Sequence, residues 1–465
     1  MKKFLLLMLS IITMMSNTVA FGEVYVENDK LSAPNIEAQS AILMDMNSGR
    51  VIYSKNPDEQ LYPASTTKIL TGIMALELAN MQDVVTADLA SLAPITNEDS
   101  HMGILIGEHL TMEQLINGML IYSANDAANV IATHISGTSE HFVELMNQKA
   151  QELGAINTHF TNTYGIQDED HYTTASDLAI ISRYAMQNPQ FREIVGRKVY
   201  NIPATNKYTT ERILPSTNLF LSTFRSDKYY YPAVNGIKTG HTNSAGFCLV
   251  SSAKVENTEL LCVVLKANSQ EMCYSNSRAL FDYGFKNYQY RALATAGEVI
   301  SDSKVYEAKD DERVAFTVTE DVSALLPKDA ELSEIVETVI DLPEKIKAPI
   351  KKGDVIGKVS YNYKTQMIGY SDLVATNDVE RNNLLFVFHL IVGILVSPFF
   401  LIPAIGVVVI LVLRQINIAK QERRKRLRRL HGKSSKAQIR PGTKRPVNTR
   451  YEEPSRKRGP KSPRK

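Results

Sequence analysis

Three short strings hold the residues of this chain that could perform chemistry. They are Ser-x-x-Lys at residues 65–68, Ser-x-Asn at 123–125 and Lys-Thr-Gly at 238–240. A serine hydroxyl becomes a strong nucleophile when a neighbouring base takes its proton, and a lysine with a lowered pKa can be that base. Ser-x-x-Lys occurs four times in the sequence and Ser-x-Asn also recurs, so each string alone is weak evidence. Their order and context must decide.

The context of Ser65 favours a reactive serine. Pro63 precedes it, and the apolar stretch from Ile69 to Leu78 predicts a buried helix that begins near Ser65. A serine in a first helical turn lies near unpaired N–H groups and the positive end of the helix dipole. Lys68, three residues on, shares its face of the helix. The alternative is a serine that caps the helix beside a solvated lysine.

The other two strings fit the walls of a cleft. Ser123 and Asn125 lie within a helical stretch, and a junction between two helices there would project a hydroxyl and a carboxamide together. Residues 238–240 open a β-like run, where a cation, a hydroxyl and Gly240 could receive an extended peptide and its carboxylate. The alternatives are a polar helix surface and an ordinary entry into a strand.

The elements that would position these strings predict an α+β domain up to about residue 290. A hairpin is expected over 37–55, mostly helix over 110–150, a polar loop over 155–172 and a second hairpin over 233–266 with its turn near 254–258. Residues 296–378 have short β-like runs separated by Gly, Pro and charged residues, which predicts a small all-β domain. It contains no catalytic constellation.

Charge and hydropathy predict an exported protein. Residues 414–465 hold 20 Lys/Arg and 3 Asp/Glu, so the net charge of +2 conceals an acidic body of −15 and a basic tail. Lys2 and Lys3, an apolar run and small residues at 18–20 predict a signal peptide over 1–20. An uncleaved N-terminal anchor is the alternative.

A second apolar run, 384–413, has 30 residues without Asp, Glu, Lys or Arg, whereas one helical span needs about 20 and two need about 40. We therefore expect one transmembrane helix, tilted or bent at Pro398 and Pro403. The basic block that follows predicts a cytoplasmic, disordered tail over 414–465 and a catalytic domain outside the cytoplasm, in a single-pass protein of the cell membrane.

The three cysteines, Cys248, Cys262 and Cys273, are too few for a disulfide framework. Cys248 and Cys262 could face each other across a hairpin, but buried free thiols are the favoured interpretation.

In this order, the three strings resemble the signature of the serine penicillin-recognising enzymes. The surrounding residues 62–68, 125–128, 146–154 and 236–242 resemble the D-alanyl-D-alanine carboxypeptidases, the low-molecular-weight penicillin-binding proteins of the S11 peptidase family. The similarity covers about residues 35–290, and 348–354 resembles that family's C-terminal β-domain. The resemblance implies a penicillin-binding/β-lactamase-like catalytic domain, then a small all-β domain and a transmembrane helix.

The resemblance also implies roles. Ser65 would attack the terminal D-Ala-D-Ala bond, Lys68 would be its general base, and Ser123 would relay a proton to the leaving D-alanine. The substrate-binding residues would be Asn125 for the amide, Lys238, Thr239 and Thr242 for positive potential and the carboxylate, Gly240 for close approach, and the His241 N–H, with that of Ser65, for the oxyanion hole. No cofactor or metal is implied. Peptidoglycan stem peptides and β-lactam antibiotics would be the partners.

One residue departs from the family pattern. Many relatives carry an arginine near the position of Cys273, and Arg278 is a possible substitute.

Other functions fit less well. A β-lactamase of class A would need a deacylating glutamate in a Glu-x-x-Leu-Asn segment between the second and third strings. Residues 113–117 approximate this segment but precede Ser123, so Glu169 is the remaining candidate. A transpeptidase differs only in its acceptor, and a zinc carboxypeptidase lacks the expected His spacing. A catalytically inactive wall-binding scaffold is the non-enzymatic alternative. The helix at 384–413 and the basic tail would contact membrane lipid, and no specific nucleic acid is expected.

Overall fold

The structure, a computed structural model, describes residues 32–434 except residues 97 and 311. The predicted signal peptide and the tail from residue 435 lie outside the described residues. The described chain divides into two units. One holds residues up to 305 with 313–346 and 350–378, and the other holds 306–312, 347–349 and the residues from 379 on.

An antiparallel sheet of five strands lies at the centre of the catalytic region. Its spatial order is β2 (Val51–Lys55), β1 (Ser40–Asp45), β9 (Thr258–Ala267), β8 (Gly246–Val255) and β7 (Val234–Thr242). The predicted hairpin at 37–55 corresponds to β1 and β2. The segment 233–266 holds three strands instead of two, because the chain also turns at residues 243–245. Cys248 lies opposite Gly240 and Cys262 opposite Ser251, and all three cysteines are buried and free.

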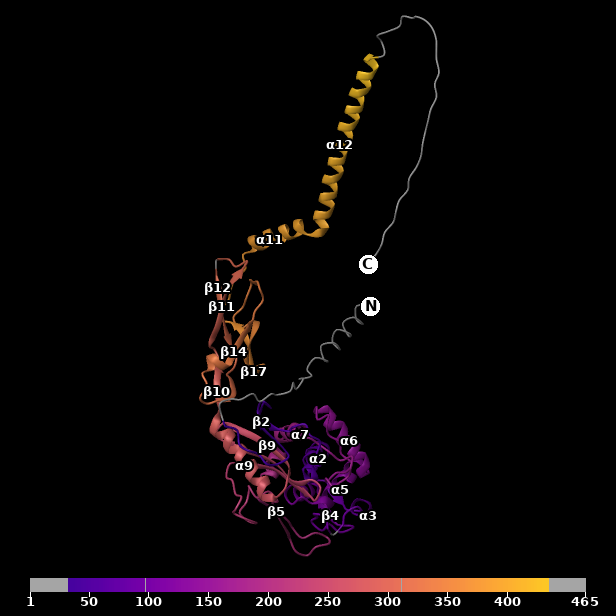
Figure 1. Ribbon diagram of the computed structural model, residues 1–465, viewed down its shortest axis with the longest axis vertical. Coiled ribbons are helices and arrows are strands. Elements are labelled where there is room, and N and C mark those ends of the chain that lie inside the picture. Colours follow the sequence, from indigo (N-terminus) through magenta and orange to yellow (C-terminus); the bar gives the residue numbers. More distant parts are fainter. Residues whose placement is uncertain (1–31, 97, 311, 435–465) are drawn as a thin grey trace, which may run out of the picture. The chain divides into compact units, whose positions relative to one another are not determined.

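Helices cover both faces of this sheet, as Figure 1 shows. Side chains alternate between the faces of a strand. Leu43 and Val264 therefore pack in one core with α9, whereas Ile42 and Val263 pack in another with the remaining helices. The helical elements are η1 (Ala64–Thr67), α2 (Lys68–Leu78), α3 (Leu89–Leu92), α4 (Met112–Ile121), α5 (Asn125–Ser136), α6 (Ser139–Glu152), α7 (Ala175–Gln187), α8 (Pro189–Val195) and α9 (Gln270–Asn287).

Two small two-stranded sheets flank the helices: β3 (Val84–Thr86) with β4 (His109–Thr111), and β5 (Val199–Ile202) with β6 (Arg212–Pro215). The segments that precede β4 and β6 carry residues that bear on the site described below.

The segment that follows α9 is almost entirely β-structure. Strands β10 (Tyr288–Ala294) and β13 (Val322–Pro327) form one pair. The larger sheet has the order β14 (Val336–Asp341), β16 (Val355–Tyr363), β17 (Gln366–Ala375), β12 (Arg313–Val318), β11 (Val299–Tyr306) and β15 (Ile346–Lys347), and α10 (Leu332–Ile335) is a single short turn. The α+β catalytic domain followed by a small all-β domain is thus confirmed.

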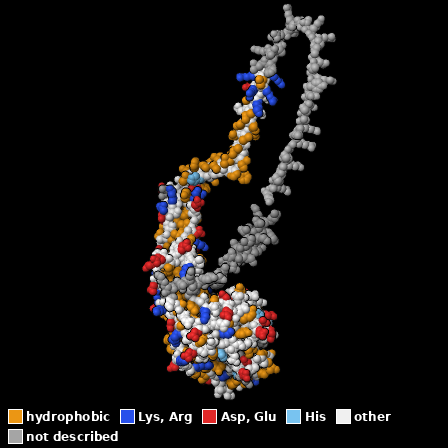
Figure 2. All heavy atoms as spheres, viewed as in Figure 1, with side chains coloured by type: hydrophobic (Ala, Val, Ile, Leu, Met, Phe, Trp, Pro, Cys, Tyr) orange, Lys and Arg blue, Asp and Glu red, His pale blue; other side chains and the backbone are white. Residues whose placement is uncertain are grey.

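The apolar C-terminal segment forms two helices, α11 (Asn383–Val396) and α12 (Pro398–Ser434). The helix breaks at Ser397, because proline cannot donate the N–H that would continue α11, whereas Pro403 lies inside α12. Residues 398–429 are long and apolar enough for one membrane span by length and composition. Figure 2 shows hydrophobic side chains over α11 and the first part of α12, then Lys and Arg.

The expected disorder from residue 414 is wrong for residues 414–434, which continue α12. Leu, Lys, Arg, Gln and Glu are strong helix formers, and the apolar turns before them have already met the cost of helix nucleation.

Candidate active site

The turn that carries Ser65 holds it at the surface of the core. A single 3-10 turn, η1, precedes α2, so the α-helix proper begins at Lys68. Ser65 is partly exposed, whereas every other residue from 63 to 70 is buried. The hydroxyl is therefore presented to solvent from a rigidly packed turn.

Lys68 lies directly beside this hydroxyl. Its Nζ is 2.8 Å from Ser65 Oγ and donates to the carbonyl of Tyr164 at 2.8 Å, and its side chain is fully buried. Burial, and then the neighbouring charge of Lys238, hold the pKa of Lys68 well below its usual value, while Asp126 and Asp99 oppose this shift. A neutral amine at this position can accept the serine proton.

A second lysine–serine pair faces the first. Ser123 lies between α4 and α5 with a φ of 71°, so the chain turns sharply there. Lys238, from β7, donates to Ser123 Oγ at 2.9 Å and to the carbonyl of Thr239 at 3.0 Å. Burial lowers the pKa of Lys238 to about 7. The predicted junction at residues 123–125 thus brings a hydroxyl to a buried amine.

Asn125 begins α5 with one polar atom free for a ligand. It is 7% exposed, its Nδ2 is 3.4 Å from Asp99 Oδ1, and its buried Oδ1 has no partner among the residues that the structure describes. Its backbone N–H donates to Ser100 O at 2.7 Å. A buried, unpaired amide oxygen costs free energy, which a donor from a bound peptide would recover.

Strand β7 forms the other side of the site. Thr239 donates to Thr217 Oγ1 at 2.8 Å, and Thr242 accepts from the Ala245 N–H at 3.0 Å. A Cβ on Gly240 would lie 2.9 Å from Pro63 O and 3.1 Å from Ser65 N, so β7 approaches the nucleophile turn as closely as a glycine allows. The exposed His241 ring packs on Phe247.

Sequence reasoning missed a histidine that supports the nucleophile turn. His171 Nδ1 accepts the Thr161 N–H at 3.0 Å, so Nε2 must carry the ring proton and donates to Thr67 Oγ1 at 2.8 Å. Thr67 in turn donates to Ala64 O at 2.9 Å. Burial lowers the pKa of His171 to about 4, so the ring is neutral at neutral pH. The sequence signal was a histidine beside two threonines at 173–174.

Sequence reasoning also missed Asp126. Its carboxylate accepts the N–H groups of Met102 and Ile104 at 3.0–3.2 Å and so fixes the segment beside Asn125. An aspartate directly after Asn125, followed by the apolar residues of a helix, was the available signal.

Two sequence-predicted residues lie outside the site. Arg278 donates to the carbonyls of Tyr229 and Tyr230 and stacks over the Tyr231 ring, so its role is structural. Glu169 lies in the exposed stretch 166–170, and among the described residues no hydrogen bond joins it to Ser65, Lys68, Ser123 or Lys238. Glu169 therefore does not support the β-lactamase interpretation, which requires a deacylating glutamate in the site.

The site combines a serine beside a buried lysine with a second buried lysine that donates to another serine. A glycine of β7 packs against the nucleophile turn. These features together define a class of enzyme. They describe a serine acyl-transfer enzyme of the penicillin-recognising type.

Comparisons with known proteins give the family. Residues 27–269 match the model of the S11 peptidases, described as D-alanyl-D-alanine carboxypeptidase, and 288–381 match that of the penicillin-binding protein 5 C-terminal domain. The chain belongs to the D-alanyl-D-alanine carboxypeptidase family, as its resemblance predicted, and is a serine carboxypeptidase.

Individual relatives agree. D-alanyl-D-alanine carboxypeptidase DacF of Bacillus subtilis is 30% identical over 74% of this chain and 86% of its own length. Penicillin-binding protein 5 of Haemophilus influenzae is 32% identical with a TM-score of 0.62, over 76% of this chain and all of that one. The Streptomyces K15 DD-transpeptidase is 30% identical with a TM-score of 0.51, over 55% of this chain and all of that one.

Proposed function

We propose that this enzyme removes the terminal D-alanine from peptidoglycan stem pentapeptides through an acyl-enzyme on Ser65. The observation that carries the proposal is the 2.8 Å contact between Ser65 Oγ and the Nζ of the fully buried Lys68. Lys68 Nζ accepts the hydroxyl proton as Oγ attacks the carbonyl of the penultimate D-alanine. The N–H groups of Ser65 and His241 hold the developing oxyanion, and such a donor is typically worth about 10²–10³ in rate.

Collapse of the tetrahedral intermediate breaks the bond to the terminal D-alanine. Ser123, backed by Lys238 at 2.9 Å, passes a proton to the leaving amine. Lys238 supplies positive potential that lowers the pKa of Lys68, and Thr239 and Thr242 hold the substrate carboxylate. Gly240 admits the peptide backbone, and Asn125 Oδ1 accepts its amide. Water then cleaves the ester and regenerates Ser65. Penicillin acylates the same oxygen, and water hydrolyses the resulting ester only slowly.

Two measurements test the proposal on the full-length protein in detergent. A fluorescent penicillin should label the wild type and not Ser65→Ala, and the wild type should release D-alanine from a pentapeptide. Absence of label at Ser65 would reject the acyl-enzyme, and label without D-alanine release would favour the scaffold. Since a similar Streptomyces enzyme is a DD-transpeptidase, an added amine acceptor should be included. We expect hydrolysis to exceed transfer.

We further propose the division of the chain and its topology. The chain would have a signal peptide over 1–20, a catalytic domain over 35–290, a β-domain over 296–378, a span over 384–413 and a basic tail over 414–465. In this arrangement the active site lies outside the cytoplasm. The basic edge of α12 supports this orientation through the positive-inside rule. A C-terminal tag should resist protease in intact spheroplasts and be cleaved after lysis; cleavage before lysis would reverse the topology.

A further inference from the structure

The acyl-donor side of the site holds a carboxylate that the mechanism above does not use. Asp99 Oδ2 accepts from the N–H and the hydroxyl of Thr96 at 2.8 and 2.9 Å. Its Oδ1 has only the 3.4 Å contact with Asn125 Nδ2. Within the part of the chain that the structure describes, no Lys, Arg or His lies within ion-pair distance of Asp99. An ionised carboxylate offers about four lone-pair sites, so this one has acceptor capacity to spare.

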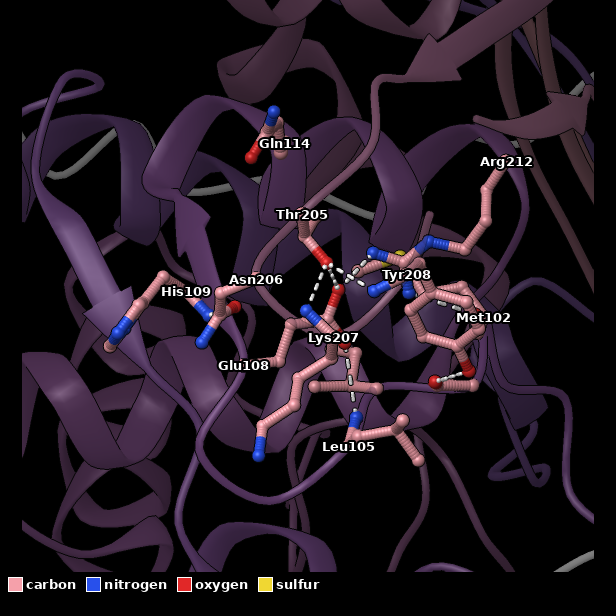
Figure 3. Close-up of polar contacts among 12 residues, drawn as sticks. Met102, Leu105, Glu108, His109, Gln114, Thr205, Asn206, Lys207, Tyr208 and Arg212 are labelled. Atoms are coloured by element: carbon pink, nitrogen blue, oxygen red, sulfur yellow. Dashed lines mark hydrogen bonds and ion pairs between the residues drawn. The ribbon is translucent and has the colours of Figure 1, made fainter. Parts of the chain in front are cut away.

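The segment that carries Asp99 is held firmly. Figure 3 shows Thr205, Tyr208 and Arg212 converging on the stretch from Met102 to Glu108. Arg212 forms an ion pair with the fully buried Glu108, which also accepts from Thr205 Oγ1 at 2.9 Å. The Tyr208 hydroxyl donates to the Gly103 carbonyl at 2.5 Å.

The Asp126 carboxylate fixes the same segment from α5, and Ser100 O accepts the Asn125 N–H. Asp99, one residue before Ser100, is thus anchored beside Asn125 at the edge of a braced segment.

Substrate geometry places this carboxylate next to one residue of the peptide. In the proposed function, Asn125 Oδ1 accepts an amide N–H of the acylated D-alanine, whose nitrogen is bonded to the carbonyl of the preceding residue. A group in contact with the Asn125 amide therefore lies near the side chain of that preceding residue. The substrate carboxylate binds on β7, near Lys238.

We propose that Asp99 recognises a protonated amine on the side chain of the residue that precedes D-Ala-D-Ala. The inference rests on the proposed function and names its preferred substrate class: donor peptides with a cationic third residue. Two observations carry the inference. Asp99 has acceptor capacity beyond its contacts with Thr96 and Asn125, and the buried Oδ1 of Asn125, which has no partner among the described residues, marks where the peptide backbone would run in the proposed function.

The electrostatics of the site agree with this placement. Asp99 acts on the pKa of Lys68 and helps to raise the pKa of Tyr164, whereas burial is what lowers the pKa of Lys238. Asp99 is thus close enough to Lys68 for its charge to act on that amine. A bound ammonium would also neutralise a charge that holds the proton on Lys68.

The test compares two peptides that differ by one charge. Nα-acetyl-L-lysyl-D-alanyl-D-alanine has a free ε-amine, and its Nε-acetyl derivative has none. For the full-length wild type we expect kcat/KM, from D-alanine release, to be about tenfold higher for the free amine, and higher salt to reduce this preference. Asp99→Asn should lose the preference and hydrolyse the two peptides with equal kcat/KM, whatever its effect on the basal rate through Lys68. Glu98→Gln, an exposed neighbouring carboxylate, should keep the preference.

Each other outcome has a distinct meaning. Equal kcat/KM values for the two peptides in the wild type overturn the inference, and this result needs no variant to fold. A preference that survives in Asp99→Asn overturns it by placing recognition elsewhere. An equal loss on both peptides in Asp99→Asn would show that Asp99 only positions Asn125, which also overturns it. If neither peptide releases D-alanine in the wild type, the proposed function itself fails.

Discussion

The two lysines of the active site and two ion pairs of the C-terminal β-domain lie at opposite extremes of burial. In the catalytic domain, Lys68 and Lys238 are almost completely buried, at 0% and 1% exposure. In the β-domain, the ion pairs Arg313–Asp302 and Lys358–Asp372 have side chains 43–64% exposed. Burying a charge is costly unless it is paired or neutralised, whereas an exposed pair has little effect on stability.

The comparison shows that the reactive groups of this fold are buried amines with lowered pKa values. Burial of two amines beside each other shifts both toward the neutral form, and neither shift helps the folded state at neutral pH. Not every buried charge in the catalytic domain is reactive, since Glu108 is fully buried and paired with Arg212 to brace a loop. Within the described part of the chain, Lys68 and Lys238 have lowered pKa values and form no ion pair with a carboxylate, and this distinguishes the active site from structural ion pairs such as Arg212–Glu108.

The largest effect is expected from Lys68→Arg. Arginine keeps the positive charge but cannot be deprotonated in a protein, so it cannot take the Ser65 proton. We expect the second-order rate of labelling by a fluorescent penicillin to fall by about 10²–10⁴, the usual range for loss of a general base. Because arginine is larger, Lys68→Met is made in parallel, with thermal unfolding to confirm a folded domain. A rate within tenfold of the wild type in both variants would exclude Lys68 as the base.

Two glycine substitutions separate the domains next. Gly240→Ala places a Cβ 2.9 Å from Pro63 O and 3.1 Å from Ser65 N, so the nucleophile turn and its oxyanion N–H must move. We expect labelling to slow by about 10². Gly297→Ala in the β-domain has open space around its Cβ but a φ of +84°, so it should cost about 1 kcal/mol of stability with no change in labelling. Equal labelling rates in both variants would contradict the role of Gly240.

A pH series examines the buried amines directly. The pKa of Lys238 is about 7 when folded and near its ordinary 10.5 when unfolded. Between these values the unfolded state binds more protons, so the unfolding free energy should rise as pH increases from about 7 to 10. Lys238→Met should flatten this rise, measured by chemical denaturation at several pH values. The slope is the readout, since the variant also removes hydrogen bonds to Ser123 and Thr239. An unchanged slope would mean that Lys238 keeps an ordinary pKa.

Much of the fold and part of the active site were predictable from the sequence, for reasons that particular residues make clear. Local periodicity predicts the helix after Ser65 and the strands around residues 240–265. The lack of a side chain at Gly240 predicts a close approach of another backbone. His171, Asp99 and Tyr164 approach Lys68 from segments 31–103 residues away, through loops whose paths no periodicity encodes. The helix from 414 to 434 was missed because composition favoured disorder while upstream nucleation favoured helix.

The smallest effect is expected from Lys358→Ala in the β-domain. Lys358 is 64% exposed, 3.9 Å from Asp372, and its amine lies 5.9 Å from the centre of the Tyr370 ring. Side-chain entropy and solvent screening offset nearly all of such contacts, so the unfolding free energy should change by less than about 0.5 kcal/mol, with labelling unchanged. Lys358→Ala removes one positive charge, as Lys238→Met does, but unlike Lys238→Met it should leave both the pH slope and the acylation rate unchanged. A loss of labelling in Lys358→Ala would show instead that charge on the β-domain reaches the active site, and the contrast between the domains would no longer hold.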